Sequence, residues 1–349
     1  MLSIQRRFHG ILCLLIFSLA VSPLIATGQN NNKRPDRSGV LWKDPGTISQ
    51  LDLFYGPGSA ALEPAPPFSY LEEDKDGESP KFKVRDSRGI EWSVKLGAEA
   101  QSETVVSRMM WAMGYFAEEA YYFDRAVING LPRLSRGREF VTGNTIQGGR
   151  FEPRRDNTKR GDTWKWLKNP HLGTRELNGL KVLMVLTANY DTSTANNRIL
   201  HVKDPSSGRT EDRFVVTDVG ATLGKIGGMG RKRSKNNLRD YRDNKFIKSV
   251  KNGYVEFDYH TRPSRLGYFT FVFAPRYWRS QSDKEKAMKR IPLVHAHWIG
   301  TMLSRLSNEQ LRDAFRAANY DDATMEGFVS TIRSRIDQLT TLTATTARY

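Results

Sequence analysis

The stretch from Leu177 to Gly224 constrains the fold more than any other part of this chain. It begins with an apolar run over residues 177–188, which predicts a buried helix capped by Thr174. A polar loop follows over residues 189–197. After a polar turn, a second apolar run over residues 213–217 predicts a strand. We therefore expect a buried helix, a loop, a hairpin and a strand in this order.

Three polar residues follow these elements at the points where a functional site is commonly built. Asp191 and Asn196 lie five residues apart in the loop, and Asp218 ends the strand in the pattern Asp-x-Gly. One aspartate can orient a nucleophilic hydroxyl, while an asparagine and a second aspartate can hold magnesium at phosphate oxygens. Asn197 is an alternative to Asn196. Taken singly, these residues are also ordinary members of loops and turns.

A lysine and a glutamate upstream suit the same chemistry. Residues 81–96 alternate polar and apolar around a turn and predict a hairpin, and residues 98–113 predict a helix with an apolar face. Lys95 ends the hairpin and Glu103 lies in the helix, so the pair could hold the phosphates of a nucleotide. Glu99, one helical turn earlier, is an alternative partner. A surface lysine and a solvated carboxylate are the plain alternative.

The other segments predict a mixture of strands and helices. Residues 115–130 suit a helix end followed by a strand, whereas residues 131–173 lack strong periodicity. A short strand is expected at the start of Leu51–Gly58, and another over residues 268–273. The tail is expected to be helical, with helices over residues 292–306, from residue 307 onward, and over residues 324–339.

The N-terminus predicts an exported protein. Arg6 and Arg7 precede a mostly apolar stretch, and small residues before Gln29 suit cleavage of a signal peptide after residue 28. An uncleaved membrane anchor is the alternative. Cleavage would remove Cys13, the single cysteine of the chain, so we expect no disulfide and no zinc site. The protein is expected to be periplasmic or extracellular.

A strongly basic segment follows the expected site. The chain carries a net charge of +16, and residues 225–251 hold ten lysines or arginines against two acidic residues. Such a balance favours an anionic partner, such as a lipid head group, an acidic polymer or an acidic protein, and membrane contact is compatible with it. We expect Arg231, Lys232 and Arg233 to bind that anion. A solvated loop is the alternative, and nucleic acid is disfavoured because aromatic residues are sparse there.

Taken together, these motifs resemble the protein-kinase-like superfamily, in its atypical branch of phosphatidylinositol-kinase-like and HipA-like kinases. The phrases that carry the resemblance are Trp92-Ser-Val-Lys95-Leu-Gly97, Tyr190-Asp191 through Asn196, and Thr217-Asp218-Val219-Gly220. The chain departs from the family where Asn189-Tyr190 stands in place of His-Arg, and where Val219 stands in place of phenylalanine. No glycine-rich phosphate loop lies between two strands just before Lys95.

The resemblance implies an α+β, two-lobed kinase-like fold. A signal peptide over residues 1–28 and a flexible leader over 29–50 would precede an antiparallel-sheet N-lobe over 51–130 and a larger helical C-lobe over 131–349. Lys95 and Glu103 would bind a nucleotide, and Asp191 would be the catalytic base.

Two functions follow from this resemblance. The first is a phosphotransferase acting on a lipid head, a glycan or a protein, with magnesium or manganese at Asn196 and Asp218 and with ATP or another nucleotide as the donor. No zinc, haem or flavin is expected. The second is a non-catalytic exported protein that binds anionic partners through residues 225–251. Oligomeric state is left open by the sequence.

Overall fold

A computed structural model describes residues 39–77, 79–204, 206–227, 233–261 and 275–342. Ser38–Tyr349 forms one compact unit. The expected signal peptide, the first part of the leader and the strand expected over residues 268–273 lie outside the described residues. No helix within the described ranges is both long and apolar enough to cross a membrane.

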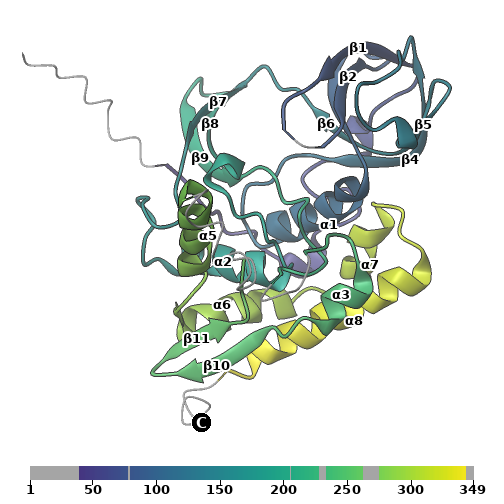
Figure 1. The fold of residues 1–349 in the computed structure, drawn as a ribbon. Coiled ribbons are helices and arrows are strands. Elements are labelled where there is room, and N and C mark those ends of the chain that lie inside the picture. The colour runs from purple at the N-terminus through teal and green to yellow at the C-terminus, as the bar shows by residue number, and fades with distance from the viewer. Residues whose placement is uncertain (1–38, 78, 205, 228–232, 262–274, 343–349) are drawn as a thin grey trace, which may run out of the picture. The chain divides into compact units, whose positions relative to one another are not determined.

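The first half of the described chain forms a closed β-barrel of five strands, and its helix α1 (Ala98–Ala112) lies beneath it (Figure 1). The barrel order is β3-β2-β1-β4-β6, closed by direct pairing of β3 with β6, with the short β5 added beside β6. All these pairings are antiparallel except that of β1 with β4. The strands are β1 (Phe68–Asp74), β2 (Lys81–Arg85), β3 (Glu91–Leu96), β4 (Tyr121–Asn129), β5 (Val141–Thr142) and β6 (Thr145–Pro153).

Alternation in the sequence explains the inside of the barrel. Phe82, Val84, Trp92 and Val94 point inward from β2 and β3 and are almost fully buried, as is Phe151 from β6. Successive residues of a strand face opposite sides, so the polar residues between them face outward. The expected hairpin over residues 81–96 is therefore present, but its second strand pairs onward to β6.

The expected two-lobed kinase-like fold with an antiparallel-sheet N-lobe is wrong, because this sheet closes into a barrel. Closure rests on β6, whose Arg150 and Phe151 pair with Lys95 and Val94 of β3. Since a closed sheet has no free edges, the barrel satisfies the backbone groups that an open sheet leaves unpaired. The sequence of residues 131–173 shows no strong periodicity, so this strand was not expected.

Two smaller antiparallel sheets complete the β-structure. β7 (Thr158–Thr163), β8 (Asn197–Lys203) and β9 (Thr210–Val216) form one of them. β10 (Ile247–Lys251), β11 (Tyr254–Phe257) and β12 (Ile291–Pro292) form the other. Strand β9 is the strand expected before Asp218, so the sequence placed it correctly.

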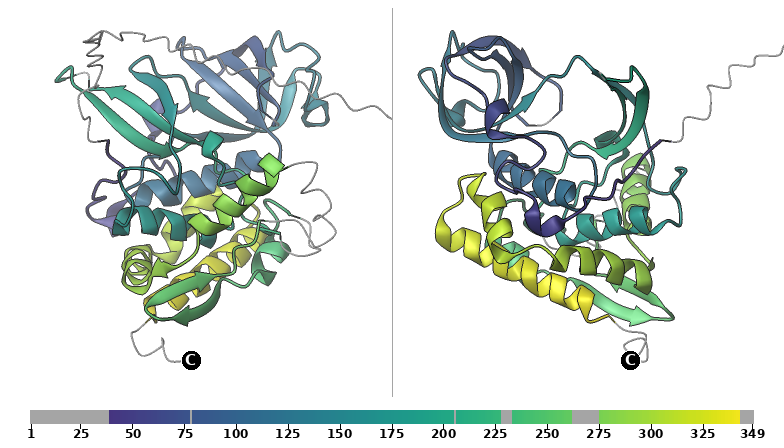
Figure 2. Two further views of the ribbon diagram at one scale, coloured as in Figure 1. Left: turned by 60° about the vertical axis from the view of Figure 1, so that its left-hand side comes forward. Right: turned by 180° about the vertical axis from the view of Figure 1, so that it is seen from behind.

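The other α-helices of the described residues contribute to both sides of the main core. They are α2 (Arg175–Leu186), α3 (Leu238–Asp243), α5 (Pro275–Ala287), α6 (Leu293–Ser304), α7 (Asn308–Arg316) and α8 (Asp322–Thr340). In both views of Figure 2 the barrel and the β7–β9 sheet lie on one side of α1 and α2, while α6 and α8 lie on the opposite side.

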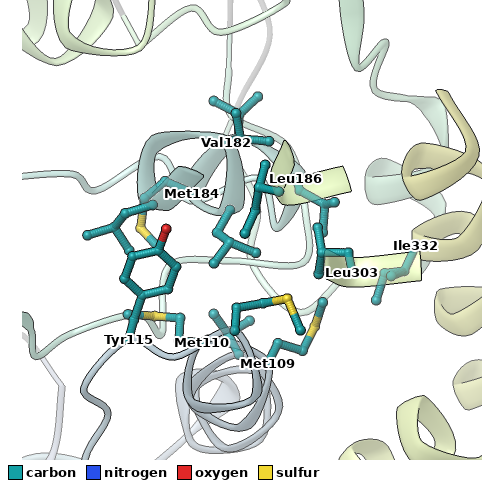
Figure 3. Close-up of a cluster of buried hydrophobic side chains, with 14 of the residues drawn as sticks. Met109, Met110, Tyr115, Val182, Met184, Leu186, Leu303 and Ile332 are labelled. Carbon is teal, nitrogen blue, oxygen red and sulfur yellow. The ribbon is translucent and has the colours of Figure 1, made fainter. Parts of the chain in front are cut away.

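The main core is made where these helices meet. Met109 and Met110 of α1 and the buried residues of α2 face Leu303 of α6 and Ile332 of α8 (Figure 3). The capping of α2 is as expected, since the Thr174 side chain accepts a hydrogen bond from the Leu177 amide. All residues of α2 from Leu177 to Leu186 are buried, including Asn178 and Lys181, so the helix lies in the core and its C-terminal end leads into the loop that carries Asp191.

The leader and the segment after it differ from expectation. We expected a flexible leader over residues 29–50, but within the described part Leu41 and Ile48 are buried and Val40 pairs with Arg213 of β9. The strand expected at the start of Leu51–Gly58 is a turn instead. Gly56, with a φ of 59°, allows the chain to reverse there.

Candidate functional site

Lys95 is the central cation of the candidate site. The Lys95 ammonium lies 2.9 Å from Glu103, 2.9 Å from Glu99 and 3.3 Å from Asp218. Strand β3 turns Val94 into the barrel and Lys95 outward, while Glu99 and Glu103 lie four residues apart on one face of α1. Both glutamates that the sequence left as alternatives therefore contact the lysine.

The surroundings keep Lys95 charged although only 8% of its side chain is exposed. Burial alone lowers the pKa of Lys95, but the carboxylates of Glu103, Asp218 and Glu99 more than reverse this and raise it above its ordinary value. Burial also opposes ionisation of Glu99, yet Lys95, followed by Lys235 and Ser79, lowers the pKa of Glu99 to about 2. An anion that enters this site meets a permanent positive charge.

Arg150 of β6 extends this cluster into the wall of the barrel. Its Nη1 lies 2.9 Å from Glu152 and 3.8 Å from Glu103, and its Nε is buried without a hydrogen-bond partner in the described residues. Burial lowers the pKa of Arg150, and Glu103 and Glu152 outweigh it, so the guanidinium is charged. Sequence reasoning missed Arg150, because it lies in the segment without recognisable periodicity.

Asp218 is held in place by the turn that follows β9. Its Oδ1 accepts hydrogen bonds from the Lys95 ammonium at 3.3 Å and from the Gly220 amide at 3.2 Å. Ser102 of α1 donates to the Gly220 carbonyl at 2.8 Å. A side chain at position 220 would lie 2.7 Å from Cβ of Glu99, so the close approach to α1 requires glycine. The Asp-x-Gly pattern thus joins the β9 end to α1.

The loop after α2 holds Asp191 and Asn196 against each other. Asn196 Nδ2 donates to the backbone carbonyl of Asp191 at 2.9 Å and to its carboxylate at 3.1 Å. The carbonyl of Asn196 accepts from the Thr217 amide at 2.8 Å, which ties this loop to the residue before Asp218. Asn197 is fully buried and donates to Trp164 instead, so Asn196 is the asparagine that faces the aspartate.

The structure therefore links four of the residues that the sequence predicted for one site, namely Lys95, Asp191, Asn196 and Asp218. Lys95 contacts Asp218 directly, and Thr217 and Asn196 connect Asp218 with Asp191. The carboxylates are accessible, since 45% of the Asp218 side chain and 42% of the Asp191 side chain are exposed. A further cation, Lys284 of α5, lies 2.6 Å from Asp191. Nothing in the sequence of α5 singles out this lysine from the other charged residues around it.

A cavity of about 1060 Å³ borders the site at Lys95. Its walls come from the barrel, from the segment between α1 and β4, and from the β7–β9 sheet. Asp191 and Asp218 are not among its lining residues, and Asp218 is joined to the cavity through its contact with Lys95. The cations that line it are Lys43, Lys81, Lys83, Lys95, Arg150, Arg154, Arg155, Arg160 and Arg213, against the acids Asp44, Asp74, Glu118, Glu119, Glu152 and Asp156. Apart from Arg154, these cations are ion-paired with carboxylates of the cavity or of its surroundings, such as Glu72 and Glu211.

The donor atoms of the site suit a hard cation such as magnesium. Within the described residues, both hydrogen bonds of Asp218 involve Oδ1, and Asn196 turns its Nδ2 toward Asp191. The second carboxylate oxygen of Asp218 and the amide oxygen of Asn196 therefore remain available as metal ligands. Magnesium prefers oxygen ligands. No group of three or more His, Cys, Asp or Glu residues that could hold a metal occurs in the described part of the chain.

The expected anion-binding cluster is not supported at Arg233. Its guanidinium donates to the Thr261 carbonyl and to the Gln281 side chain at 2.9 Å, and it stacks over the Tyr190 ring at 5.5 Å. Arg233 thus holds together segments of this protein and is not a free surface cation. Arg231 and Lys232 lie outside the described residues.

Comparison with known proteins adds no relationship, because neither a family model, nor a curated protein, nor a solved structure matches this chain.

Proposed function

We propose that this protein is a metal-dependent phosphotransferase whose phosphoryl donor is a nucleotide. The observation that carries the proposal is the position of Lys95, which is buried, charged and in contact with Glu103 and Asp218, and which lines a cavity. A preorganised cation in a largely buried site stabilises phosphate oxygens far better than one in water.

Each polar residue has a role in this proposal. Lys95 binds phosphate oxygens of the donor, and Glu99 and Glu103 hold its ammonium in position. Asp191 accepts the proton of an acceptor hydroxyl as the new P–O bond forms and the bond to the leaving phosphate oxygen breaks. Magnesium held by Asn196 and Asp218 would neutralise charge on the phosphate oxygens. The acceptor is a hydroxyl group of a lipid head, a glycan or a protein.

Ligand-dependent thermal stability tests this proposal. ATP with magnesium or manganese should raise the melting temperature of the protein, because a ligand that binds only the folded state stabilises it. Asp218→Ala should lose this response, whereas Asp243→Ala, at an exposed position in α3, should keep it. No response of the unaltered protein to any nucleotide–metal pair would refute the proposal.

A second candidate function is the binding of an anionic surface by the basic segment. Arg239, Arg242, Lys245, Lys248 and Lys251 are exposed on α3, on β10 and between them. For such a function, replacing Lys245, Lys248 and Lys251 by glutamate should abolish binding to anionic vesicles at low salt. The unaltered protein should bind less as salt rises, because exposed charges are screened beyond about 8 Å at physiological ionic strength. Unchanged binding of the variant would identify these residues as an ordinary solvated face.

A further inference from the structure

Lys284 makes a contact with the candidate base that the roles above leave unexplained. Its ammonium lies 2.6 Å from Asp191 Oδ1, and 8% of its side chain is exposed, against 42% for that of Asp191. The lysine comes from α5, 93 residues further along the chain. A buried cation is therefore directed at a half-exposed carboxylate in the loop that also carries Asn196.

Helix α5 is anchored so that Lys284 stays in this position. The Thr261 amide donates to the Glu285 carboxylate at 3.0 Å, and the Thr261 hydroxyl donates to the Gln281 carbonyl at 3.1 Å. Gln281, Lys284 and Glu285 are three and four residues apart, so they share one face of the helix. Ala287 and Met288, at and just beyond the C-terminal end of α5, are buried in the core. These contacts thus fix the backbone of α5 at the point from which the Lys284 side chain extends to Asp191.

The ammonium of Lys284 has more donors than this ion pair uses. A lysine carries three N–H donors, and within the described residues one of them is engaged, by Asp191. Burying a charged lysine stem with a single half-exposed partner gives little net stability, because desolvation offsets the attraction. The arrangement suits a cation that takes a second anionic partner when a ligand arrives.

We propose that Lys284 is a catalytic residue that contacts the phosphoryl group during its transfer beside Asp191. This inference rests on the proposed function. The N–H donors of Lys284 that Asp191 does not use would bind oxygens of the phosphoryl group as it passes to the acceptor hydroxyl. Fixed cations at developing negative charge are a large source of rate enhancement.

A transition-state mimic separates this role from a structural one. The probes are magnesium with ADP, and magnesium with ADP plus aluminium fluoride, which occupies the place of the transferring phosphoryl group. We expect aluminium fluoride to tighten nucleotide binding by the unaltered protein, since transition-state mimics bind more tightly than ground-state ligands. Lys284→Met should bind magnesium–ADP with unchanged affinity. Its affinity for magnesium–ADP with aluminium fluoride should be about 100-fold lower than that of the unaltered protein.

Two further variants keep this test decisive. Lys286→Met removes a lysine of the same helix whose side chain is 64% exposed, and it should behave as the unaltered protein. Lys284→Arg keeps the charge and should recover part of the added affinity, which a purely structural role does not predict. If Lys284→Met is too unstable to measure, the comparison of Lys284→Arg with Lys286→Met gives the answer, because full loss in Lys284→Arg would contradict the proposal.

The outcomes distinguish the two proposals. No binding of magnesium–ADP or magnesium–ATP by the unaltered protein overturns the proposed function itself. Normal magnesium–ADP binding with no added affinity from aluminium fluoride, or with full added affinity in Lys284→Met, overturns only the role of Lys284. Selective loss of the added affinity in Lys284→Met supports both.

Discussion

Two clusters of charged residues in this protein use the same chemistry in opposite surroundings. The barrel network is buried except at Asp218 and consists of Lys95, Glu99, Glu103, Arg150, Glu152 and Asp218. The helix network lies on the surface of α7 and α8 and consists of Glu309, Arg312, Asp313, Arg316 and Glu326. Charged groups lie within 2.9 Å in both, for example Lys95 and Glu103, or Arg312 and Glu326.

The two networks differ in the free energy that is lost when an ion pair is broken. Exposed ion pairs contribute about 0–1 kcal/mol, because water solvates both partners when the pair opens. Breaking a buried pair leaves an uncompensated charge and costs about 3–5 kcal/mol. A short distance alone therefore says little about function. A buried network that also borders a cavity and accessible carboxylates, as the barrel network does, is the informative one.

The largest effect should come from removing a buried partner. Glu103→Ala removes the carboxylate that Lys95 and Arg150 share, although Glu99, Asp218 and Glu152 still contact them, so the free energy of unfolding should fall by up to about 3–5 kcal/mol. It should also abolish the nucleotide response. Glu309→Ala removes the corresponding shared carboxylate of the helix network and should change stability far less, because water solvates the partners of an exposed ion pair when it opens. Urea unfolding of both variants measures the contrast, and equal losses would contradict it.

The free energy of unfolding at acidic pH should depend on Glu99. Its pKa is about 2 in the folded protein against an ordinary 4.5, so its contribution is fully present above about pH 4.5 and is lost as pH falls toward 2. The contribution is at most about 3 kcal/mol. Glu99→Gln should therefore be less stable than the unaltered protein at pH 6, and the two should converge near pH 2. Thermal unfolding across this range measures the difference, and a gap that does not change with pH would contradict this account.

A substitution that moves no charge tests the geometry of the barrel network. Gly220→Ala places a Cβ 2.7 Å from Cβ of Glu99, which must shift away from Lys95. We expect a loss of about 1–3 kcal/mol, typical of overpacking, together with weaker nucleotide binding. Thermal unfolding with and without magnesium–ATP measures both effects. Unchanged stability and unchanged nucleotide affinity would show that the Asp218 turn tolerates a side chain.

The smallest effect should come from the helix network itself. Arg312→Gln removes the centre of its ion pairs with Glu309 and Glu326. The change in unfolding free energy should be smaller than for any of the substitutions above, and it should shrink further at high salt. A loss as large as that of Glu103→Ala would mean that exposure does not separate the two networks.

The sequence predicted the local elements that carry the candidate site. The alternation in residues 81–96 predicted β2 and β3, the expected helix over 98–113 is α1, and the apolar run after Thr174 is α2. The same patterns located Lys95, Glu103, Asp191, Asn196 and Asp218, because each follows or lies within a strongly periodic element. Their functional roles remain predictions. The two-lobed fold was wrong, since strand patterns indicate which face is buried but not which strand closes a sheet.

Tertiary structure alone decided the rest of the site. Arg150 reaches Glu103 because β6 closes the barrel against β3, and Lys284 reaches Asp191 from a helix 93 residues away. Neither residue differs in its local sequence from the many exposed cations of this basic chain. Periodicity reports burial over a few neighbouring residues, whereas these contacts depend on which distant surfaces pack together. The physical reason is that the free energy of such packing depends on long-range complementarity of shape and charge, which no short stretch of sequence contains.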